Sequence, residues 1–342
     1  MPDSAEEPFH STEDSLITNN VAFPTCPDEL NREWLASALG RTVENFETHP
    51  IGGGKGNLGD LVLVALENGE QVVAKFAANR QEALNAAKRS GLFEREIKFY
   101  HELAPKLDIR LPTLFASDYD PSSAHFIMLL EYLEPIQDSD SITGIGIEYT
   151  RELFTELSKL HAQGRDLVDT SWVQTMISQH RIDNLTIMIE KGWPVLQEIC
   201  GELVDPLKDI NLLDRFLETM SYLNTLDQTI VHGDVKPDNL IISNQGVTII
   251  DWQGFGTGPA AWDIAYCMCQ CLTTEERRLY ESELLDSYPH DLVGYKESLF
   301  FGIVIACALP LLGNPDEPRL GKLVQVTAER TINAMSDAGT LN

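Results

Sequence analysis

The segment from Val231 to Asp263 constrains this chain most strongly, because it gathers three oxygen-bearing side chains around one short hairpin. Asp234 and Asn239 lie five positions apart in the run HGDVKPDN. Two short apolar runs around a glycine-containing turn follow within residues 240–250, a pattern that predicts a β-hairpin. Asp251 ends the second strand, so the hairpin should bring it close to the other two side chains.

Such a set of side chains suits phosphoryl transfer. That reaction needs a carboxylate to orient the attacking hydroxyl group, and an amide and a second carboxylate to bind Mg²⁺. We assign the first role to Asp234 and the metal to Asn239 and Asp251. Asp and Asn are also common turn residues, and each of the three alone could be only that. Their combined spacing around one hairpin favours the catalytic interpretation.

The run HGDVKPDN, followed by DWQ and GPAAWDIAY, resembles the aminoglycoside phosphotransferase and choline kinase group, and most closely its ecdysteroid kinase-like branch. The resemblance covers about residues 45–310. It implies an α+β, protein-kinase-like fold with a small β-sheet lobe carrying one main helix and a larger, mostly helical lobe. We accordingly expect a flexible tail (1–25), an N-lobe (26–130), a hinge (131–135) and a C-lobe (136–342).

A glycine-rich stretch, Ile51–Asp60, matches G-x-G-x-x-G at its last three glycines. A dinucleotide site would require a helix next, whereas a strand-like run follows, as in the nucleotide loop of kinases. A Walker loop is excluded because Lys55 is followed by glycine. A flexible hairpin tip remains the alternative. By resemblance, the residues of this loop that contact the nucleotide are Gly52, Gly53, Gly54, Gly56, Asn57 and Gly59.

Lys75 lies at the centre of the third predicted strand, among apolar neighbours, and needs either solvent or a partner. The next predicted helix, Leu92–Leu103, carries Glu96 at the border of its apolar stripe, while Glu94 and Arg95 should face outward. The family's ion pair therefore maps onto Lys75 and Glu96, with the lysine contacting the α and β phosphates. Glu94 as the partner, or an exposed lysine on an edge strand, are the alternatives.

The resemblance also implies roles for single residues. Backbone groups near Glu131 and Leu133, at the hinge, would hold the adenine edge. Lys236 could touch the γ-phosphate, or it could be an ordinary loop lysine. We call residues 231–239, before the hairpin, the catalytic loop, and residues 250–255, around Asp251, the metal loop. His232 should hydrogen-bond backbone near the metal loop, and Asp263 should brace the catalytic loop.

The acceptor should be a small molecule. Only 12 positions separate Asp251 from Asp263, and a helix is predicted at once. A protein kinase needs a longer segment here, with its A-P-E signature, to dock a peptide. In the family, residues 165–228 form the acceptor pocket. We interpret Trp172 and Trp193 in this region as packing residues rather than a cage for a cation.

Amino-acid composition limits the classes of molecule that this protein is expected to bind. Lysine and arginine number 25 against 53 acidic residues, a formal net charge of −28, which disfavours binding to nucleic acid or anionic lipid. A cationic substrate and a merely solvated acidic surface both fit this charge. The first thirty residues lack Lys and Arg, so a secretory or transit peptide is not expected. The apolar run Leu299–Leu312 contains Pro310 and should be a buried helix. The six cysteines should be small hydrophobic residues in a reducing cytoplasm.

We therefore predict ATP- and Mg²⁺-dependent phosphorylation of a hydroxyl group on a small molecule. Aminoglycosides, amino alcohols and apolar hydroxylated metabolites such as steroids are all compatible acceptors. The alternative is a catalytically silent kinase-fold protein that acts as a binding or scaffold module. Such proteins usually lose the base, the metal aspartate or the lysine, and this chain has all three. A NAD-dependent oxidoreductase has only the glycine loop in its favour.

Overall fold

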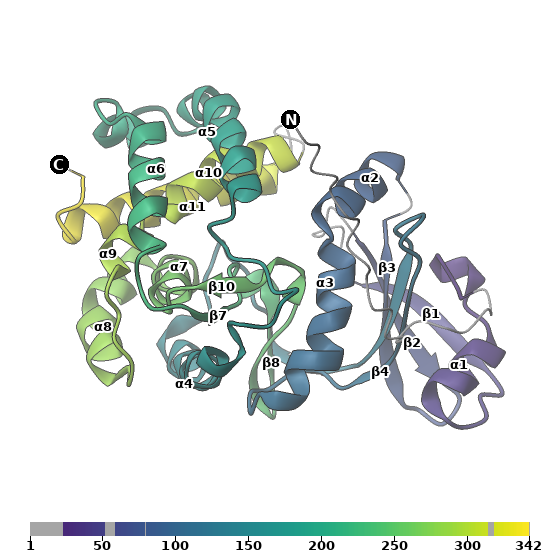
Figure 1. Cartoon of the computed structure of the whole chain (residues 1–342). Coiled ribbons are helices and arrows are strands. Elements are labelled where there is room, and N and C mark those ends of the chain that lie inside the picture. Colours follow the sequence, from purple (N-terminus) through teal and green to yellow (C-terminus); the bar gives the residue numbers. More distant parts are fainter. Residues whose placement is uncertain (1–22, 52–58, 79, 314–317, 342) are drawn as a thin grey trace, which may run out of the picture.

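The computed structural model of the chain describes residues 23–51, 59–78, 80–313 and 318–341, which form two lobes (Figure 1). The N-terminal lobe is built on an antiparallel sheet whose strands follow the order β1 (Phe46–Ile51), β2 (Gly59–Leu66), β3 (Gln71–Ala77), β5 (Phe126–Glu131) and β4 (Leu114–Tyr119). Its helices are α1 (Arg32–Leu39), α2 (Gln81–Ser90) and α3 (Leu92–Lys98).

The C-terminal lobe is mostly helical. Its helices are α4 (Gly146–Gly164), α5 (Gln179–Cys200), α6 (Leu212–Leu223), α7 (Ala261–Cys271), α8 (Thr274–Ser287), α9 (Tyr295–Ser298), α10 (Phe301–Leu312) and α11 (Pro318–Asp337). Two small antiparallel sheets complete it: β6 (Pro135–Gln137) with β8 (Leu240–Ser243) and β9 (Gly246–Ile249), and β7 (Thr229–Val231) with β10 (Gly256–Gly258). The predicted hairpin is thus present as β8 and β9, in register from Leu240 opposite Ile249 to Ser243 opposite Gly246.

Local sequence explains where the N-terminal helices begin and end. The side chain of Asn31 accepts a hydrogen bond from the Trp34 amide and caps α1, which ends at Gly40 with a φ of 66°. The sequence analysis assigned no helix to residues 81–90, where the structure has α2. Gly91, at a φ of 63°, separates α2 from α3. The predicted helix Leu92–Leu103 is α-helical only to Lys98 and continues as a π-helical turn over Phe99–Leu103.

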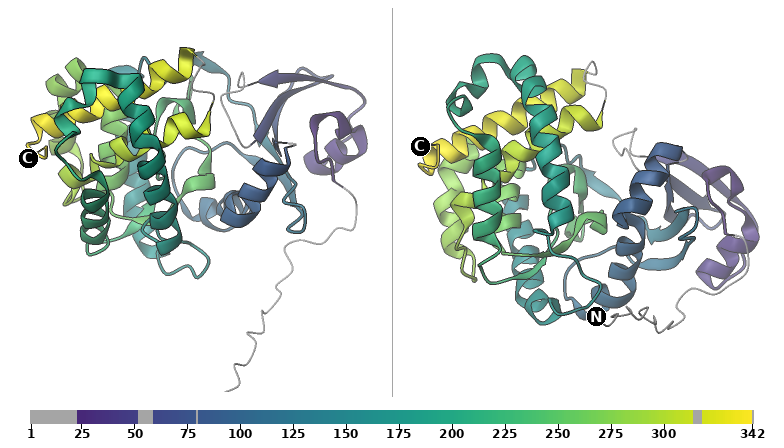
Figure 2. Two further views of the ribbon diagram at one scale, coloured as in Figure 1. Left: turned by 90° about the horizontal axis from the view of Figure 1, so that it is seen from above. Right: turned by 45° about the horizontal axis from the view of Figure 1, so that its top comes forward.

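The hydrophobic core is not divided at the boundary between the lobes. One cluster joins residues of α3, such as Phe93 and Ile97, to one face of the sheet and to the interior of the C-terminal lobe. The Phe99 ring stacks on the Trp252 ring at 4.0 Å between centroids and 7° between planes. A smaller cluster, which includes Leu35 of α1, covers the other sheet face. In both figures α3 accordingly lies on the side of the sheet that faces the C-terminal lobe (Figure 2).

The apolar run near the C-terminus packs as a core helix. Within the described residues, one helical stretch, Tyr295–Leu312, is long and apolar enough to cross a membrane by length and composition alone, and 67% of it is buried inside the protein. The prediction of a buried helix is confirmed by α10. Gly192 of α5 lets that helix approach α10 closely, because a Cβ at this position would lie 1.9 Å from the carbonyl oxygen of Cys307.

Candidate active site

One buried carboxylate holds the backbone of the catalytic loop by hydrogen bonds. Asp263, in the first turn of α7, accepts hydrogen bonds from the backbone amides of His232 and Gly233, both at 2.8 Å. His161 of α4 contacts the same carboxylate at 3.1 Å. Asp263 therefore occupies the bracing position that the resemblance implied.

Three side chains of the catalytic loop converge beside this brace. The Asp234 carboxylate accepts a hydrogen bond from Asn239 Nδ2 at 2.9 Å and pairs with Lys236 Nζ at 2.7 Å. Burial lowers the pKa of Lys236, but Asp234 more than compensates and raises it above its ordinary value. Asn239 is held by its amide nitrogen, and its Oδ1 has no hydrogen-bond partner among the described residues. That oxygen is therefore available to a ligand.

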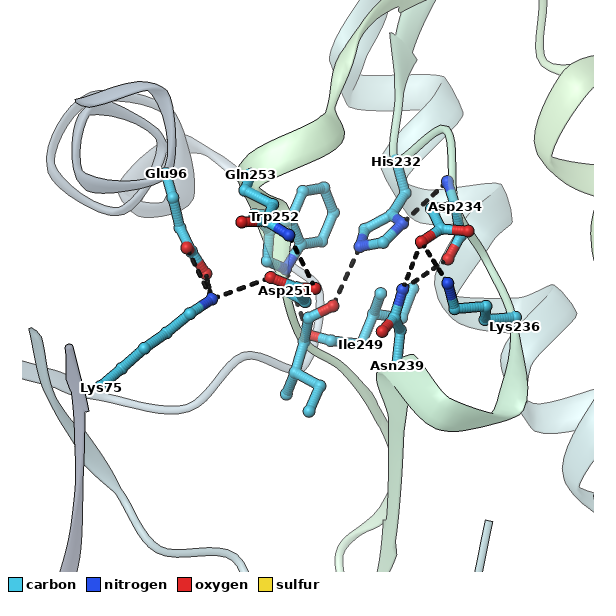
Figure 3. A network of polar contacts seen from close by, with 11 residues as sticks. Lys75, Glu96, His232, Asp234, Lys236, Asn239, Ile249, Asp251, Trp252 and Gln253 are labelled. Carbon is cyan, nitrogen blue, oxygen red and sulfur yellow. Dashed lines mark hydrogen bonds and ion pairs between the residues drawn. The ribbon is translucent and has the colours of Figure 1, made fainter. Parts of the chain in front are cut away.

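The metal loop meets the catalytic loop through the backbone. The Ile250 amide donates to the Asn239 carbonyl oxygen at 3.0 Å, and His232 Nε2 lies 3.0 Å from the Ile250 carbonyl oxygen. His232 thus makes the backbone contact expected of it. Asp251, the next residue, has the left-handed φ of 65°, which is uncommon for a residue other than glycine and is often associated with functional sites. Figure 3 shows the catalytic and metal loops side by side.

Lys75 joins the two lobes. Its Nζ lies 2.7 Å and 2.8 Å from the two carboxylate oxygens of Glu96 on α3, and 2.8 Å from Asp251 Oδ1 on the metal loop (Figure 3). The ion pair expected between Lys75 and Glu96 is therefore present. Glu94, the alternative partner, pairs instead with Lys98 at 2.7 Å. Lys75 lies on β3 between β2 and β5, so it is not on an edge strand.

The three charged groups of this triad (Lys75, Glu96 and Asp251) shift one another's pKa values. Burial alone would lower the pKa of Lys75, but Asp251 and Glu96 together raise it. Burial raises the pKa of Glu96, and the lysine charge offsets only part of that effect. For Asp251 burial acts in the same direction, but the charge of Lys75 outweighs it and lowers the pKa. At neutral pH the Asp251 carboxylate is therefore ionised, as a metal ligand must be.

Of the glycine-loop residues predicted to contact the nucleotide, the structure describes Gly59, which lies near Lys75. Gly52, Gly53, Gly54, Gly56 and Asn57 lie outside the described residues. Gly59 begins β2 opposite Ala77 of β3, and a Cβ there would lie 4.0 Å from Lys75 Cε. Gly59, the last glycine of the stretch, therefore lies in the sheet beside the lysine.

The two hinge residues, Glu131 and Leu133, differ in whether their backbone groups are already hydrogen-bonded. The backbone amide of Glu131 donates to the Thr113 carbonyl oxygen at 2.8 Å, and its carboxylate accepts from the Thr113 hydroxyl group, also at 2.8 Å. The backbone of Leu133 makes no hydrogen bond to any described residue. Of the two, Leu133 is thus the one whose N–H and C=O groups can pair with a base.

One expectation is wrong, and it concerns a residue of the site's surroundings. Arg95 does not face outward: it is only 7% exposed, and its guanidinium group donates to the Gln253 carbonyl oxygen at 3.2 Å and to Gln174 Oε1 at 2.8 Å. Arg181, at the start of α5, donates to the neighbouring Gly254 carbonyl oxygen at 2.6 Å. Neither arginine carries a sequence signal, because each contacts a loop that lies far away in the chain, 158 residues from Arg95 and 73 residues from Arg181.

Comparisons with known proteins show the family and the fold of this chain. The sequence model of the "Phosphotransferase enzyme family" matches residues 50–294. A search of curated proteins finds no match. Among solved structures, the GDP and kanamycin complex of APH(2")-IIia aligns with a TM-score of 0.57 at 18% identity, covering 87% of this chain and 97% of that one.

Two further structures align over similar lengths. Choline kinase LicA from Streptococcus pneumoniae gives a TM-score of 0.52 at 17% identity, and spectinomycin phosphotransferase with ADP and spectinomycin gives 0.54 at 12%. In both cases the alignment covers 90% of this chain and 97% of the other. The predicted two-lobe, kinase-like fold is confirmed. The narrower ecdysteroid kinase-like branch stays a prediction.

Proposed function

Because this chain belongs to the phosphotransferase enzyme family, we propose that it transfers the γ-phosphoryl group of ATP to a hydroxyl group of a small molecule, with Mg²⁺ bound at Asn239 and Asp251. The observation that carries the proposal is the position of Lys75 Nζ. It lies within 2.8 Å of both Glu96 and Asp251, and so links the nucleotide lobe to the metal loop. A cation held at this point is placed to contact nucleotide phosphates.

Each charged side chain then has one task. Asp234 accepts a hydrogen bond from the acceptor hydroxyl group and orients its oxygen toward the γ-phosphorus. It takes up the hydroxyl proton as the new P–O bond forms and the bond from the γ-phosphorus to the bridging oxygen of ATP breaks, which releases ADP. Lys75 holds phosphate oxygens, and Lys236, whose Nζ lies 2.7 Å from the Asp234 carboxylate, contacts the γ-phosphate. The backbone of Leu133 pairs with the base.

The residues present fit Mg²⁺. The free Oδ1 of Asn239 and the ionised carboxylate of Asp251 are the hard oxygen ligands that this ion prefers, and nucleotide phosphates and water usually complete its shell. When bound, the ion neutralises charge that develops on the phosphate oxygens.

Several details remain part of the proposal. We propose ATP as the donor, although the structural relatives include complexes with both GDP and ADP. The acceptors named for them, kanamycin and spectinomycin, and the choline kinase, support a small hydroxylated acceptor here. We also propose a cytoplasmic location, because Cys26, Cys200, Cys267, Cys269, Cys271 and Cys307 are free thiols. A catalytically silent scaffold is disfavoured, since this chain carries Asp234, Lys75, Asn239 and Asp251, the residues that we propose as base, phosphate-binding lysine and metal ligands.

Replacing the base should separate chemistry from binding. In Asp234→Ala, turnover of an accepted hydroxyl compound should fall by about 10²- to 10⁴-fold, while calorimetry should detect nearly unchanged Mg·ATP affinity. Asp227→Ala, the same change at an exposed aspartate on the segment before β7, is the matched control. Unchanged turnover in Asp234→Ala would remove this loop from the mechanism.

Replacing the metal ligand should instead weaken binding. In Asp251→Ala, calorimetry should show a loss of nucleotide affinity that is present with Mg²⁺ and absent when EDTA has removed the ion. An equal loss with and without EDTA would show that Asp251 acts on the nucleotide without a metal.

A further inference from the structure

Two guanidinium groups approach the same turn of the metal loop from different lobes. Arg95 of α3 donates to the carbonyl oxygen of Gln253, and Arg181 of α5 donates to that of the next residue, Gly254. Burial lowers the pKa of Arg181 to about 10, and the positive charge of Arg95 contributes to that shift. We call these two residues the arginine pair. Like charges thus lie close together in a protein whose net charge is −28.

The partners of the arginine pair do not neutralise it. Arg95 donates to two carbonyl oxygens and to the side-chain oxygen of Gln174. Arg181 donates to one carbonyl oxygen and to the sulfur of Met176, which is a weak acceptor. In the part of the chain that the structure describes, no carboxylate pairs with either residue. Both guanidinium groups are therefore partly desolvated without an opposite charge to pair with, which costs free energy.

Arg330 shows what a purely structural buried arginine looks like in this protein. It is 6% exposed and donates to three backbone carbonyl oxygens, those of Ser141, Gln270 and Ile142. Arg181 has one carbonyl oxygen where Arg330 has three. Arg181 is thus less satisfied than Arg330, whereas Arg95 has three oxygen acceptors, as Arg330 does.

Arg181 also lies at the unfavourable end of its helix. It occupies the first turn of α5, where the helix dipole is positive and where no acidic residue is present. Anions are stabilised at such a position and cations are not. Although the Ser178 side chain caps this helix end by accepting from the Arg181 amide, the helix dipole and the arginine pair act in the same sense, and together they favour negative charge in this region.

This region adjoins the catalytic loop. Met176, which contacts Arg181, packs against Gly233, where a Cβ would lie 2.4 Å from the methionine Cε. Gly233 immediately precedes the base Asp234. Arg181 also belongs to the helical region that follows α4, from which the resemblance predicts the acceptor pocket. An anion held by the arginine pair would thus be only a few side chains away from the reacting hydroxyl group.

We propose that Arg95 and Arg181 bind an anionic group, a carboxylate or a phosphate, carried by the acceptor molecule. This inference rests on the proposed function and narrows its substrate class to hydroxy acids or hydroxylated phosphate esters. Guanidinium groups suit both anions, because their planar forks of N–H donors match carboxylate and phosphate oxygens. Polycationic acceptors are disfavoured, since the arginine pair would repel them.

Binding of inorganic phosphate tests the site directly. Calorimetry would use full-length protein saturated with Mg²⁺ and a non-hydrolysable ATP analogue, so that the nucleotide site cannot take up the probe. We expect wild type to bind one phosphate, and Arg181→Gln to bind it about 10- to 100-fold more weakly. Arg151→Gln, which removes an exposed arginine paired with Glu148 and Glu283, should bind phosphate as wild type does.

The same titrations decide against the proposal if wild type binds no phosphate, or if the two variants bind it equally well. Affinity for the ATP analogue, measured in each variant, shows that the protein has folded. Arg181→Lys provides a second variant: it keeps the charge but loses the planar fork, and phosphate affinity should fall between the wild-type and Arg181→Gln values.

Paired acceptors then test the substrate class. Small hydroxy acids would be compared with their methyl esters, and phosphorylated product followed by mass spectrometry. We expect kcat/KM to be about 10- to 100-fold higher for the acids in wild type and the preference to disappear in Arg181→Gln. A preference for the esters, or one that survives in Arg181→Gln, would overturn the proposal. If no compound is phosphorylated and ATP is not turned over, the proposed function fails, whereas the phosphate titration still decides whether the anion site exists.

Discussion

Arg95 and Glu96 are neighbours on α3, yet they face opposite electrostatic surroundings. Glu96 is 1% exposed and pairs with Lys75, which in turn pairs with Asp251. Arg95 is 7% exposed and has only uncharged oxygen partners, with a second guanidinium group close by. On one side of the helix each buried charge is balanced by another, and on the other side positive charges accumulate. The first arrangement fixes the position of the Lys75 ammonium group, and the second leaves positive charge that a bound anion would balance.

The largest loss of stability should come from replacing Lys75, which pairs with both acids of the triad. Lys75→Met leaves the carboxylates of Glu96 and Asp251 without their cation, and breaking a buried pair in this way typically costs about 3–5 kcal/mol. Denaturant unfolding would measure the loss. Lys98→Met is the control, because it removes an exposed pair with Glu94 on the same helix, worth about 0.3–0.5 kcal/mol. Equal losses in the two variants would show that the triad is not a stabilising unit.

The contributions of the two acids of the triad to stability should respond to pH in opposite directions. Burial raises the folded-state pKa of Glu96, so its contribution to stability grows as pH falls from that raised pKa to about 4.3. For Asp251, the lysine charge overcomes burial and lowers the pKa, so its contribution is complete above about pH 3.9 and is lost as pH falls through the folded-state pKa.

Unfolding curves measured from pH 7 to pH 3 would separate these contributions. Relative to wild type, Glu96→Gln should lose stability as the pH falls, and Asp251→Asn should recover it. Parallel curves for both variants would contradict the opposite assignment of the two pKa shifts.

The smallest effect, about 0.5–1 kcal/mol, is the coupling within the arginine pair. If the two guanidinium groups repel each other, Arg95→Gln and Arg181→Gln each relieve the repulsion, and the double variant can relieve it only once. The double variant should therefore be less stable than the sum of the single changes predicts. A cycle between Lys75→Met and Glu96→Gln should give the opposite sign. Coupling energies of the same sign in both cycles would contradict the contrast between repulsion within the arginine pair and attraction between Lys75 and Glu96.

Sequence patterns were sufficient wherever the chemistry depends on residues close together in the chain. Asp234, Asn239 and the hairpin lie within 20 positions, so local geometry brings them together. The pairing of Lys75 with Glu96 could be inferred because β3 and α3 belong to one lobe. The roles of these residues in catalysis stay predictions until they are tested.

Arg95 shows why the rest could not be inferred. Helical periodicity gives the direction of a side chain relative to its own sheet, and on that basis Arg95 points away from the N-terminal lobe. The metal loop that covers it follows about 160 residues later in the chain, and nothing in the sequence of α3 marks that second contact. Arg181 likewise contacts a part of the metal loop that lies 73 residues away in the chain. Residues 81–90, which form α2, contain only one large apolar side chain, Leu84, so their apolar stripe is weak in the sequence.

The undivided core described above has a consequence for thermal behaviour. Since the Phe99 ring of the N-terminal lobe stacks on Trp252 of the metal loop inside one apolar cluster, neither lobe can lose its interior without the other. Scanning calorimetry should accordingly record a single cooperative heat-absorption peak for both lobes. Only α1, whose contacts belong to the smaller cluster on the far sheet face, is free to melt ahead of it.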